Sequence, residues 1–285
     1  PVDWDAVVLG GRLQWIQSSA AGMDHCLTPS VVASEITVTS ASGVLADQVA
    51  EHTIALVTGW LRSLPVFFRA QQSKEFVRRP TRDLHHSTVG IVGFGGVGRR
   101  LAQVLSPFKT RILAVDLFPL DKPDHVEALW PPDRLDELLA ECDIVVLSLP
   151  LNDDTRGSVA AEQFARMKPT ALFANMARGQ LVATADLVEA LQAKRIAGAV
   201  MDVTDPEPLP PESELWGMPN VIITPHVGGQ CATRIDDMTD LFCENLRRWK
   251  AGEPLVNLLT EKRLGFPIRV AGNPLWTDVV GAKRC

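Results

Sequence analysis

Short apolar runs alternate with amphipathic stretches along the chain from Thr88 onward. The runs are almost wholly apolar, which is typical of parallel strands covered on both faces, and they span 88–94, 111–116, 143–149, 171–175, 197–203 and 221–224. The amphipathic stretches between them include 101–105, 135–141 and 183–194. This alternation predicts βαβ units and therefore an α/β fold built on a doubly wound parallel sheet.

The two ends of the chain have a different pattern. They contribute two strand patterns and two long helical patterns, which lie at 12–17, 35–39, 46–63 and 234–250. The last helix is followed by Gly252, a common residue just past the end of a helix. Long helices on either side of the alternating region predict two domains, a sheet domain at 69–245 and a smaller domain formed by 1–68 and 246–285.

The composition is that of an acidic globular protein. The 285 residues are 46% hydrophobic and carry a formal net charge of −6, so we expect neither nucleic acid nor an anionic membrane as a partner. There is no apolar run of roughly 18 residues and no signal-peptide pattern. The cysteines lack a CxxC spacing, which argues against disulfides and a metal site and favours a cytoplasmic protein; they are Cys26, Cys142, Cys231, Cys243 and Cys285.

A glycine motif follows the first of the apolar runs. Gly93-Phe94-Gly95-Gly96-Val97-Gly98 has the spacing G-x-G-x-x-G between a predicted strand and a predicted helix, which is the context of a dinucleotide-binding loop. The first glycine permits a tight turn, the second lets the backbone approach a pyrophosphate, and the third lets the helix pack against the strand. The motif therefore indicates a Rossmann dinucleotide-binding domain.

Asp116 indicates which dinucleotide is expected. It ends the second apolar run, roughly 20 residues after the glycines, where a carboxylate binds the ribose hydroxyls of NAD. Its negative charge would repel the 2′-phosphate of NADP, and Leu117-Phe118-Pro119 provides no arginine to bind that phosphate. We therefore expect NAD as the cofactor.

Polar side chains follow three of the later apolar runs, where open α/β sheets bind ligands. They are Arg178, Glu207 and His226. An arginine can bind a carboxylate and polarise a keto oxygen, a histidine can deliver a proton as a hydride arrives, and a nearby glutamate favours the imidazolium. Each residue taken alone is equally consistent with a structural role. Together on one sheet they predict hydride transfer between nicotinamide and a small 2-keto acid.

Several stretches of the chain resemble the D-isomer-specific 2-hydroxyacid dehydrogenase family, and within it the glyoxylate/hydroxypyruvate reductase branch. They are LQWIQSSAAGMDH (13–25), VGIVGFGGVG (89–98), NMARGQLV (175–182), MDVTDPEPLP (201–210) and TPHVGG (224–229). The resemblance implies a homodimer and a smaller, flavodoxin-like substrate domain. Relatives usually carry more N-terminal residues, so either the sequence omits a stretch or this domain is reduced. Phe76 stands where many relatives have a tryptophan in a segment linked to dimer contacts, and 267–285 extends past the usual end.

The resemblance also implies roles for individual residues. Arg178, Glu207 and His226 are the catalytic set, and Asp202 is expected at the nicotinamide carboxamide. The expected substrate contacts are Arg178, His226 and the backbone N–H groups of Ala20, Ala21, Gly22 and Met23. The expected cofactor contacts are Gly93, Gly95, Gly96, Val97, Gly98, Asp116, Pro150, Thr155, Met176, Ala177, Arg178, Asp202, His226 and Gly228.

Two functional hypotheses follow from the residues and the resemblance. The first is an NAD-dependent D-2-hydroxyacid dehydrogenase, or 2-keto acid reductase, for an acid such as glyoxylate or hydroxypyruvate or for a larger apolar 2-keto acid. A phosphorylated acid is disfavoured because 17–25 contains neither arginine nor lysine. The second is an NAD(H)-sensing interaction protein of the same fold, like the transcriptional corepressors, which the acidic chain and the lack of a basic cluster disfavour.

Overall fold

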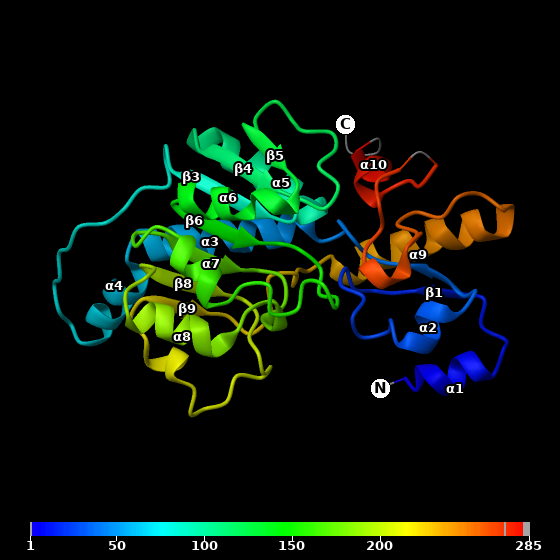
Figure 1. Cartoon of the computed structure of the whole chain (residues 1–285), viewed down its shortest axis with the longest axis horizontal. Coiled ribbons are helices and arrows are strands. Elements are labelled where there is room, and N and C mark those ends of the chain that lie inside the picture. The colour runs from blue at the N-terminus through cyan, green and yellow to red at the C-terminus, as the bar shows by residue number, and fades with distance from the viewer. Residues whose placement is uncertain (1, 271, 282–285) are drawn as a thin grey trace. The chain divides into compact units, whose positions relative to one another are not determined.

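The computed structural model describes residues 2–270 and 272–281 (Figure 1). The chain forms two compact units. The larger, called the sheet unit below, comprises Asp47–Leu149 and Thr155–Gly228. The smaller, called the small unit, is drawn from Pro1–Ala46, Pro150–Asp154 and Gly229–Cys285. Among the helices of the described residues, none has the length and apolar character needed to cross a membrane.

The sheet unit is built on a seven-stranded sheet in which every neighbouring pair is parallel. The strand order is β5-β4-β3-β6-β7-β8-β9, so the chain builds outward from β3 in one direction and then returns to build in the other. This confirms the predicted doubly wound α/β fold. The strands are β3 (Thr88–Val92), β4 (Arg111–Val115), β5 (Ala128–Trp130), β6 (Ile144–Leu147), β7 (Leu172–Asn175), β8 (Gly198–Met201) and β9 (Val221–Ile223).

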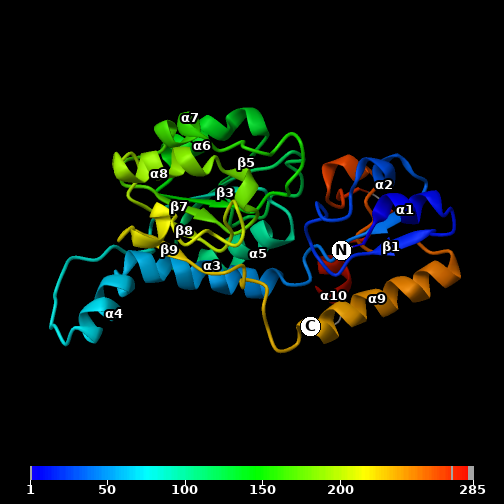
Figure 2. The same cartoon turned by 90° about the horizontal axis from the view of Figure 1, so that it is seen from below.

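Helices cover both faces of this sheet, with α6, α7 and α8 on one side and α3 and α5 on the other (Figure 2). The four central strands β3, β6, β7 and β8 are buried along almost their whole length, as expected for strands covered on both faces. The helices are α3 (Ala46–Leu61), α4 (Leu64–Gln72), α5 (Gly96–Leu105), α6 (Leu135–Glu141), α7 (Ala161–Arg166) and α8 (Thr184–Gln192), with short 3-10 turns η1 (Ser106–Phe108), η2 (Pro132–Arg134), η3 (Gly179–Leu181) and η4 (Glu214–Gly217).

The small unit holds a two-stranded parallel sheet of β1 (Trp15–Gln17) and β2 (Thr37–Thr39). Both strands were expected from the sequence, although each is shorter than its apolar pattern. Ile16 and Val38 belong to a buried cluster with Met23, Val31 and Leu259. The helices of this unit are α1 (Trp4–Leu9), α2 (Pro29–Ala33), α9 (Arg234–Ala251) and α10 (Trp276–Gly281), with the 3-10 turn η5 (Lys262–Leu264).

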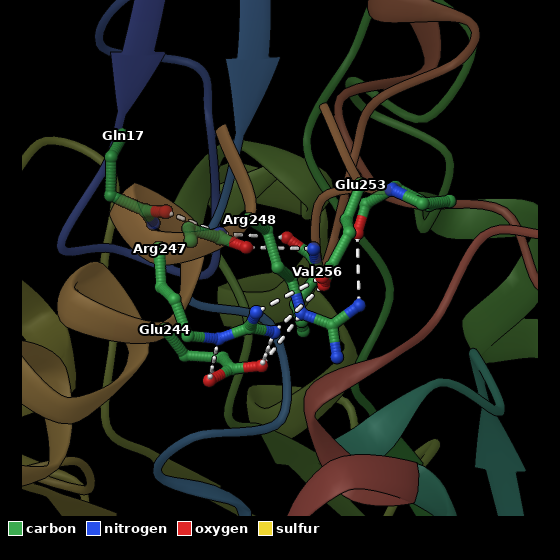
Figure 3. Close-up of polar contacts among 8 residues, drawn as sticks. Gln17, Glu244, Arg247, Arg248, Glu253 and Val256 are labelled. Atoms are coloured by element: carbon green, nitrogen blue, oxygen red, sulfur yellow. Dashed lines mark hydrogen bonds and ion pairs between the residues drawn. The ribbon is translucent and has the colours of Figure 1, made fainter. Parts of the chain in front are cut away.

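Asn245 fastens α9 to the rest of the small unit. Its side chain is fully buried, and its Nδ2 donates to the Gln17 side chain at 2.7 Å and to the Val256 carbonyl at 3.0 Å. The Val256 amide donates back to Oδ1 of Asn245 at 2.7 Å (Figure 3). A buried amide with three such partners fixes the helix against both β1 and the following chain.

An ion-pair network lies beside this contact, in the last turns of α9. Glu244 accepts from Arg248 at 2.7 Å and from Arg247 at 3.1 Å, and Arg247 also donates to Glu253 at 2.8 Å (Figure 3). The hydrogen bond from Arg247 is the largest influence on Glu244 and, with that from Arg248, lowers the pKa of its carboxyl from 4.5 to about 2. Glu244 is therefore ionised throughout the physiological range.

The boundaries between the units differ from those expected at 1–68, 69–245 and 246–285. Residues 47–68 lie in the sheet unit, because Ala50, Val57 and Leu61 of α3 are buried in the same core cluster as the strands. Residues 229–245 lie in the small unit, because Leu241 of α9 is buried in a cluster with Val256 and Trp276. Periodicity predicted both helices but did not identify the surface that each one covers.

The C-terminal extension packs against the small unit over its described part. Asn273 donates to the carbonyls of Leu258 and Ile268 at 3.1 and 2.8 Å. Trp276 at the start of α10 is buried, and its amide donates to Oδ1 of Asn257 at 3.0 Å. The last part of the predicted 267–285 extension, Cys285 included, lies outside the described residues.

Candidate active site

The glycine loop joins β3 to α5 and has the backbone geometry that the motif predicts. Gly93 has φ of +95°, and a Cβ there would lie 2.7 Å from the Leu149 amide nitrogen. A Cβ on Gly98 would lie 2.3 Å from the Gly93 carbonyl oxygen. At Gly95 a Cβ would meet nothing within 4 Å. The first and third glycines are thus required by the fold, whereas the second leaves bare backbone at the helix N-terminus, as a phosphate-binding loop requires.

Asp116 follows β4 and organises the loop beside it. Its Oδ2 accepts the Phe94 amide at 2.6 Å, and its Oδ1 accepts the Phe118 amide at 2.9 Å. Each carboxylate oxygen has a second lone pair, so the group can still accept hydrogen bonds from two ribose hydroxyls. The Asp116 carboxylate is therefore held by backbone next to the glycine loop, with its charge directed to that loop.

Arg99 is the cation nearest in sequence to the motif, and the sequence pattern gave no indication of its role. Its guanidinium lies over the Phe94 ring at 4.9 Å and donates to the carbonyls of Leu120 and Asp121 at 2.6 and 2.8 Å. These contacts join the glycine loop to the segment after Asp116. They give Arg99 a structural role that its position in the chain does not reveal.

His226 and Glu207 form a direct pair. Nδ1 of His226 lies 2.7 Å from Oε1 of Glu207, and their side chains are 44% and 40% exposed. Glu207 lies in the segment after β8, and His226 follows β9, its neighbour in the sheet. The carboxylate thereby fixes the ring orientation and directs Nε2 away from the pair.

Arg178 stands at the carboxyl end of β7, two strands from β9 in the sheet. Asn175 Nδ2 donates to the Arg178 carbonyl at 2.8 Å, and the Asn175 side-chain oxygen accepts the Ala177 amide at 3.1 Å. The arginine Nη1 donates to the Ala177 carbonyl at 2.8 Å. Because all three strands are parallel, Arg178, Glu207 and His226 lie at the same edge of the sheet.

The buried carboxylate of Asp202 holds the segment that carries His226. It accepts the Thr224 hydroxyl at 2.6 Å and the amides of Val227 and Gly228 at 2.9 and 2.8 Å. Nε2 of His52 lies 3.3 Å from Oδ1 of the same group. This contact joins His52 on α3 to Asp202, which follows β8, and these elements are too far apart in the chain for residue spacing to reveal it.

The other predicted contacts fall in both units. Met176 and Ala177 follow β7, and Thr155 begins the second segment of the sheet unit, whereas Pro150 lies in the small unit. The substrate contacts expected from Ala20, Ala21, Gly22 and Met23 also lie in the small unit. In that loop the Ala20 amide donates to the Ser18 hydroxyl at 3.0 Å, and Met23 is 1% exposed.

Burial sets the chemistry of two of the four described cysteines. Burial raises the pKa of the Cys26 thiol to about 11 and that of Cys142 to about 12, so neither is a thiolate nucleophile at neutral pH. Cys231 and Cys243 are also free. Within 2–270 and 272–281, no group of three or more histidine, cysteine, aspartate or glutamate side chains could hold a metal ion.

The comparison with known families decides the identity. The model of the D-isomer specific 2-hydroxyacid dehydrogenase NAD-binding domain matches residues 54–228, which is more than half of the chain. The matched part contains the glycine loop, Asp116 and the strand ends that carry Arg178, Glu207 and His226. The chain belongs to this family. It is therefore an oxidoreductase of the 2-hydroxyacid dehydrogenase type with a nicotinamide dinucleotide as its cofactor.

Individual relatives agree on the branch. The chain is 32% identical to glyoxylate reductase from Pyrococcus furiosus, covering 88% of this chain and 77% of that protein. It is 34% identical to glyoxylate reductase/hydroxypyruvate reductase from Mus musculus, covering 86% and 76%. The structure of NADPH-dependent glyoxylate/hydroxypyruvate reductase from Sinorhizobium meliloti, in complex with NADP and sulfate, matches with a TM-score of 0.80 at 27% identity, covering 89% and 81%.

These findings confirm the predicted family, its glyoxylate/hydroxypyruvate reductase branch and the α/β fold. The hypothesis of an NAD(H)-sensing interaction protein gains no support from them. The family model is that of an NAD-binding domain, whereas the Sinorhizobium meliloti structure contains NADP.

Proposed function

We propose that the chain is an NAD-dependent 2-keto acid reductase that acts on a small acid of the glyoxylate or hydroxypyruvate class. The observation that carries this proposal is the contact of 2.7 Å between Nδ1 of His226 and Oε1 of Glu207. A histidine whose Nδ1 is held by a carboxylate presents Nε2 as its proton-transferring atom. Reduction of a carbonyl by hydride needs one such proton donor.

The residues of the glycine loop fit a dinucleotide. The bare backbone at Gly95, flanked by the constrained Gly93 and Gly98, would hold the pyrophosphate at the N-terminus of α5. When bound, the dinucleotide supplies the hydride. We assign this binding to the sheet unit, and we assign the backbone amides of 20–23 in the small unit to the acid.

Asp116 supports NAD over NADP. Its charge would repel a 2′-phosphate, and the guanidinium of Arg99 is engaged with the Phe94 ring and the carbonyls of Leu120 and Asp121. We expect kcat/KM with NADH to exceed that with NADPH by at least about tenfold. The variant Asp116→Ser should narrow this ratio, and a wild-type enzyme that prefers NADPH would contradict the assignment.

Arg178 would bind the acid and the keto oxygen, and the pair of His226 and Glu207 would supply the proton. As the hydride reaches the carbonyl carbon, the oxygen gains negative charge, which the guanidinium stabilises and the imidazolium neutralises. The neutral imidazole then regains its proton from solvent. In the direction of oxidation the same imidazole accepts the hydroxyl proton.

A kinetic screen tests this function. The purified protein should oxidise NADH with at least one of glyoxylate, hydroxypyruvate, pyruvate, phenylpyruvate and oxaloacetate. His226→Ala should lose about a hundredfold or more in kcat while NADH affinity stays within about threefold, because the imidazole acts in proton transfer. Absence of turnover with every acid, or an active His226→Ala variant, would contradict the proposal. We also retain a homodimer as a prediction, which light scattering tests.

A further inference from the structure

The backbone around His226 adopts a conformation that needs support from its surroundings. His226 has φ of +55°, the left-handed region that non-glycine residues seldom occupy. Its amide donates to the Asp202 carbonyl at 2.7 Å. Three residues of the same segment donate to the Asp202 carboxylate, namely Thr224 through its hydroxyl and Val227 and Gly228 through their amides. We call Asp202 and the three residues that donate to its carboxylate, Thr224, Val227 and Gly228, the Asp202 cluster.

The Asp202 cluster is closely packed and almost excluded from water. Asp202 is 4% exposed, so its charge depends on the donors around it. A Cβ on Gly228 would lie 2.8 Å from Oδ2 of Asp202 and 3.3 Å from Cδ2 of His52. The segment 224–228 therefore has little room to shift, and His52 is one of the residues packed against it.

His52 reaches the cluster from another secondary structure element. It lies on α3, and its Nε2 is 2.9 Å from Oγ1 of Thr224 and 3.3 Å from Oδ1 of Asp202. The Thr224 hydroxyl donates to Asp202, so its oxygen is left to accept a hydrogen bond from His52. This arrangement makes a chain of donors from the His52 ring through the hydroxyl to the carboxylate. It connects α3, which is buried against the sheet, to the segment that carries His226.

We propose that His52 is a positioning residue for the reaction, which orients His226 by holding the Asp202 cluster to α3. The proposal rests on the proposed function, in which His226 transfers the proton. His52 has no part in binding the acid in this scheme. Loss of its hydrogen bond should let the segment 224–228 move, and displacement of a proton donor by about 1 Å can reduce the rate by up to about a hundredfold.

Two substitutions of His52 and a matched control separate the hydrogen bond from the general effect of mutating α3. His52→Leu removes the donor, whereas His52→Gln keeps an N–H group of similar reach. Thr58→Val is the control on the same helix, since the Thr58 hydroxyl donates to the Ile54 carbonyl within α3. Thr224→Val removes the middle hydroxyl and provides a second route to the same test should His52→Leu fail to fold.

Two measurements report on each variant. One is kcat and KM with the preferred 2-keto acid. The other is amide hydrogen exchange in a peptide spanning 221–229, which contains the Val227 and Gly228 amides of the cluster. We expect His52→Leu and Thr224→Val to lower kcat about tenfold, to leave KM for the acid within about twofold, and to speed exchange of this peptide about tenfold. His52→Gln should recover kcat to within about threefold of wild type, and Thr58→Val should match wild type.

The outcomes separate this proposal from the proposed function. Unchanged kcat and exchange in both His52→Leu and Thr224→Val would overturn the role of His52. It would also be overturned if His52→Gln were as impaired as His52→Leu, because the hydrogen bond would then not be the cause. If the wild-type protein reduces no acid, the proposed function fails. The exchange measurement still decides whether His52 holds the Asp202 cluster.

Discussion

Nδ1 of His226 lies 2.7 Å from Oε1 of Glu207, although 19 positions separate the two residues in the chain. The contact forms because β8 and β9 are parallel neighbours, so the segments that follow them leave the same edge of the sheet. The order of the strands, rather than any local motif, therefore brings the Glu207 carboxylate to the His226 imidazole.

Replacing Glu207 by glutamine tests what its charge contributes. Glu207→Gln keeps the size and an accepting oxygen but cannot stabilise an imidazolium as a carboxylate does. We expect kcat for keto acid reduction to fall about tenfold to a hundredfold, with KM for the acid changed by less than about threefold. Glu212→Gln, an exposed acid in the same segment, is the matched control. Equal kcat in the two variants would argue against a role for the Glu207 charge.

Much of the fold could be predicted because burial dominates it. The central strands are nearly all apolar, and the sheet buries them on both faces. β5 (Ala128–Trp130) was not predicted, since it has only three residues of intermediate burial at the edge of the sheet. The attachment of α3 and α9 to their units also could not be predicted. An amphipathic pattern identifies the apolar face of a helix but not the surface that covers it.

The candidate site was also predictable only in part. Arg178, Glu207 and His226 were predictable as types of side chain at strand ends, and the structure joins Glu207 to His226 as expected. His52 and Arg99 were missed, because their roles depend on contacts with residues that only the folded chain brings near. His52 meets Thr224 across 172 positions, a separation at which no spacing rule applies.

The second glycine of the loop offers a test of cofactor binding that leaves the fold intact. A methyl group at Gly95 would meet nothing within 4 Å in the protein, but under the proposed function it would occupy the space through which a pyrophosphate approaches the backbone. We expect Gly95→Ala to raise the Kd for NADH about tenfold or more with Tm within about 2 °C of wild type. The measurements are NADH fluorescence titration and thermal unfolding.

Two further glycines serve as controls for Gly95. Gly217 also has open space where a methyl group would lie, so Gly217→Ala should leave both NADH affinity and Tm unchanged. Gly98→Ala should lower Tm, because the new Cβ would lie 2.3 Å from the Gly93 carbonyl oxygen. If Gly95→Ala binds NADH as tightly as wild type, the loop is not the pyrophosphate site.

The kinetic constants for the keto acid should change even when Arg178 is replaced by lysine. Arg178→Lys keeps the positive charge but loses the planar fork that binds a carboxylate through two parallel hydrogen bonds. We expect KM for the keto acid to rise about tenfold and kcat to fall by a similar factor. Arg195→Lys, an exposed substitution of the same kind in the sheet unit, should have no effect on either constant. A normal KM in Arg178→Lys would show that the guanidinium geometry is not used.

The depressed pKa of Glu244 makes a prediction about acid stability. The folded-state pKa is about 2 against an ordinary value of 4.5, chiefly because of the hydrogen bond from Arg247. The resulting stabilisation is fully present above pH 4.5 and is lost as the pH falls towards 2. Since the Arg247 side chain is 53% exposed, solvent screening limits the contribution to about 1 kcal/mol.

Urea unfolding of Glu244→Gln measures this contribution directly. At pH 7 the variant should be about 1 kcal/mol less stable than wild type, and the difference should shrink when both are measured at about pH 3, where Glu244 takes up a proton on unfolding. Glu75→Gln, an exposed glutamate of the sheet unit, should show no such pH-dependent difference. High salt should weaken the effect at pH 7, because it screens the exposed guanidinium. A stability difference that is the same at both pH values would mean that Glu244 acts through packing and not through its charge.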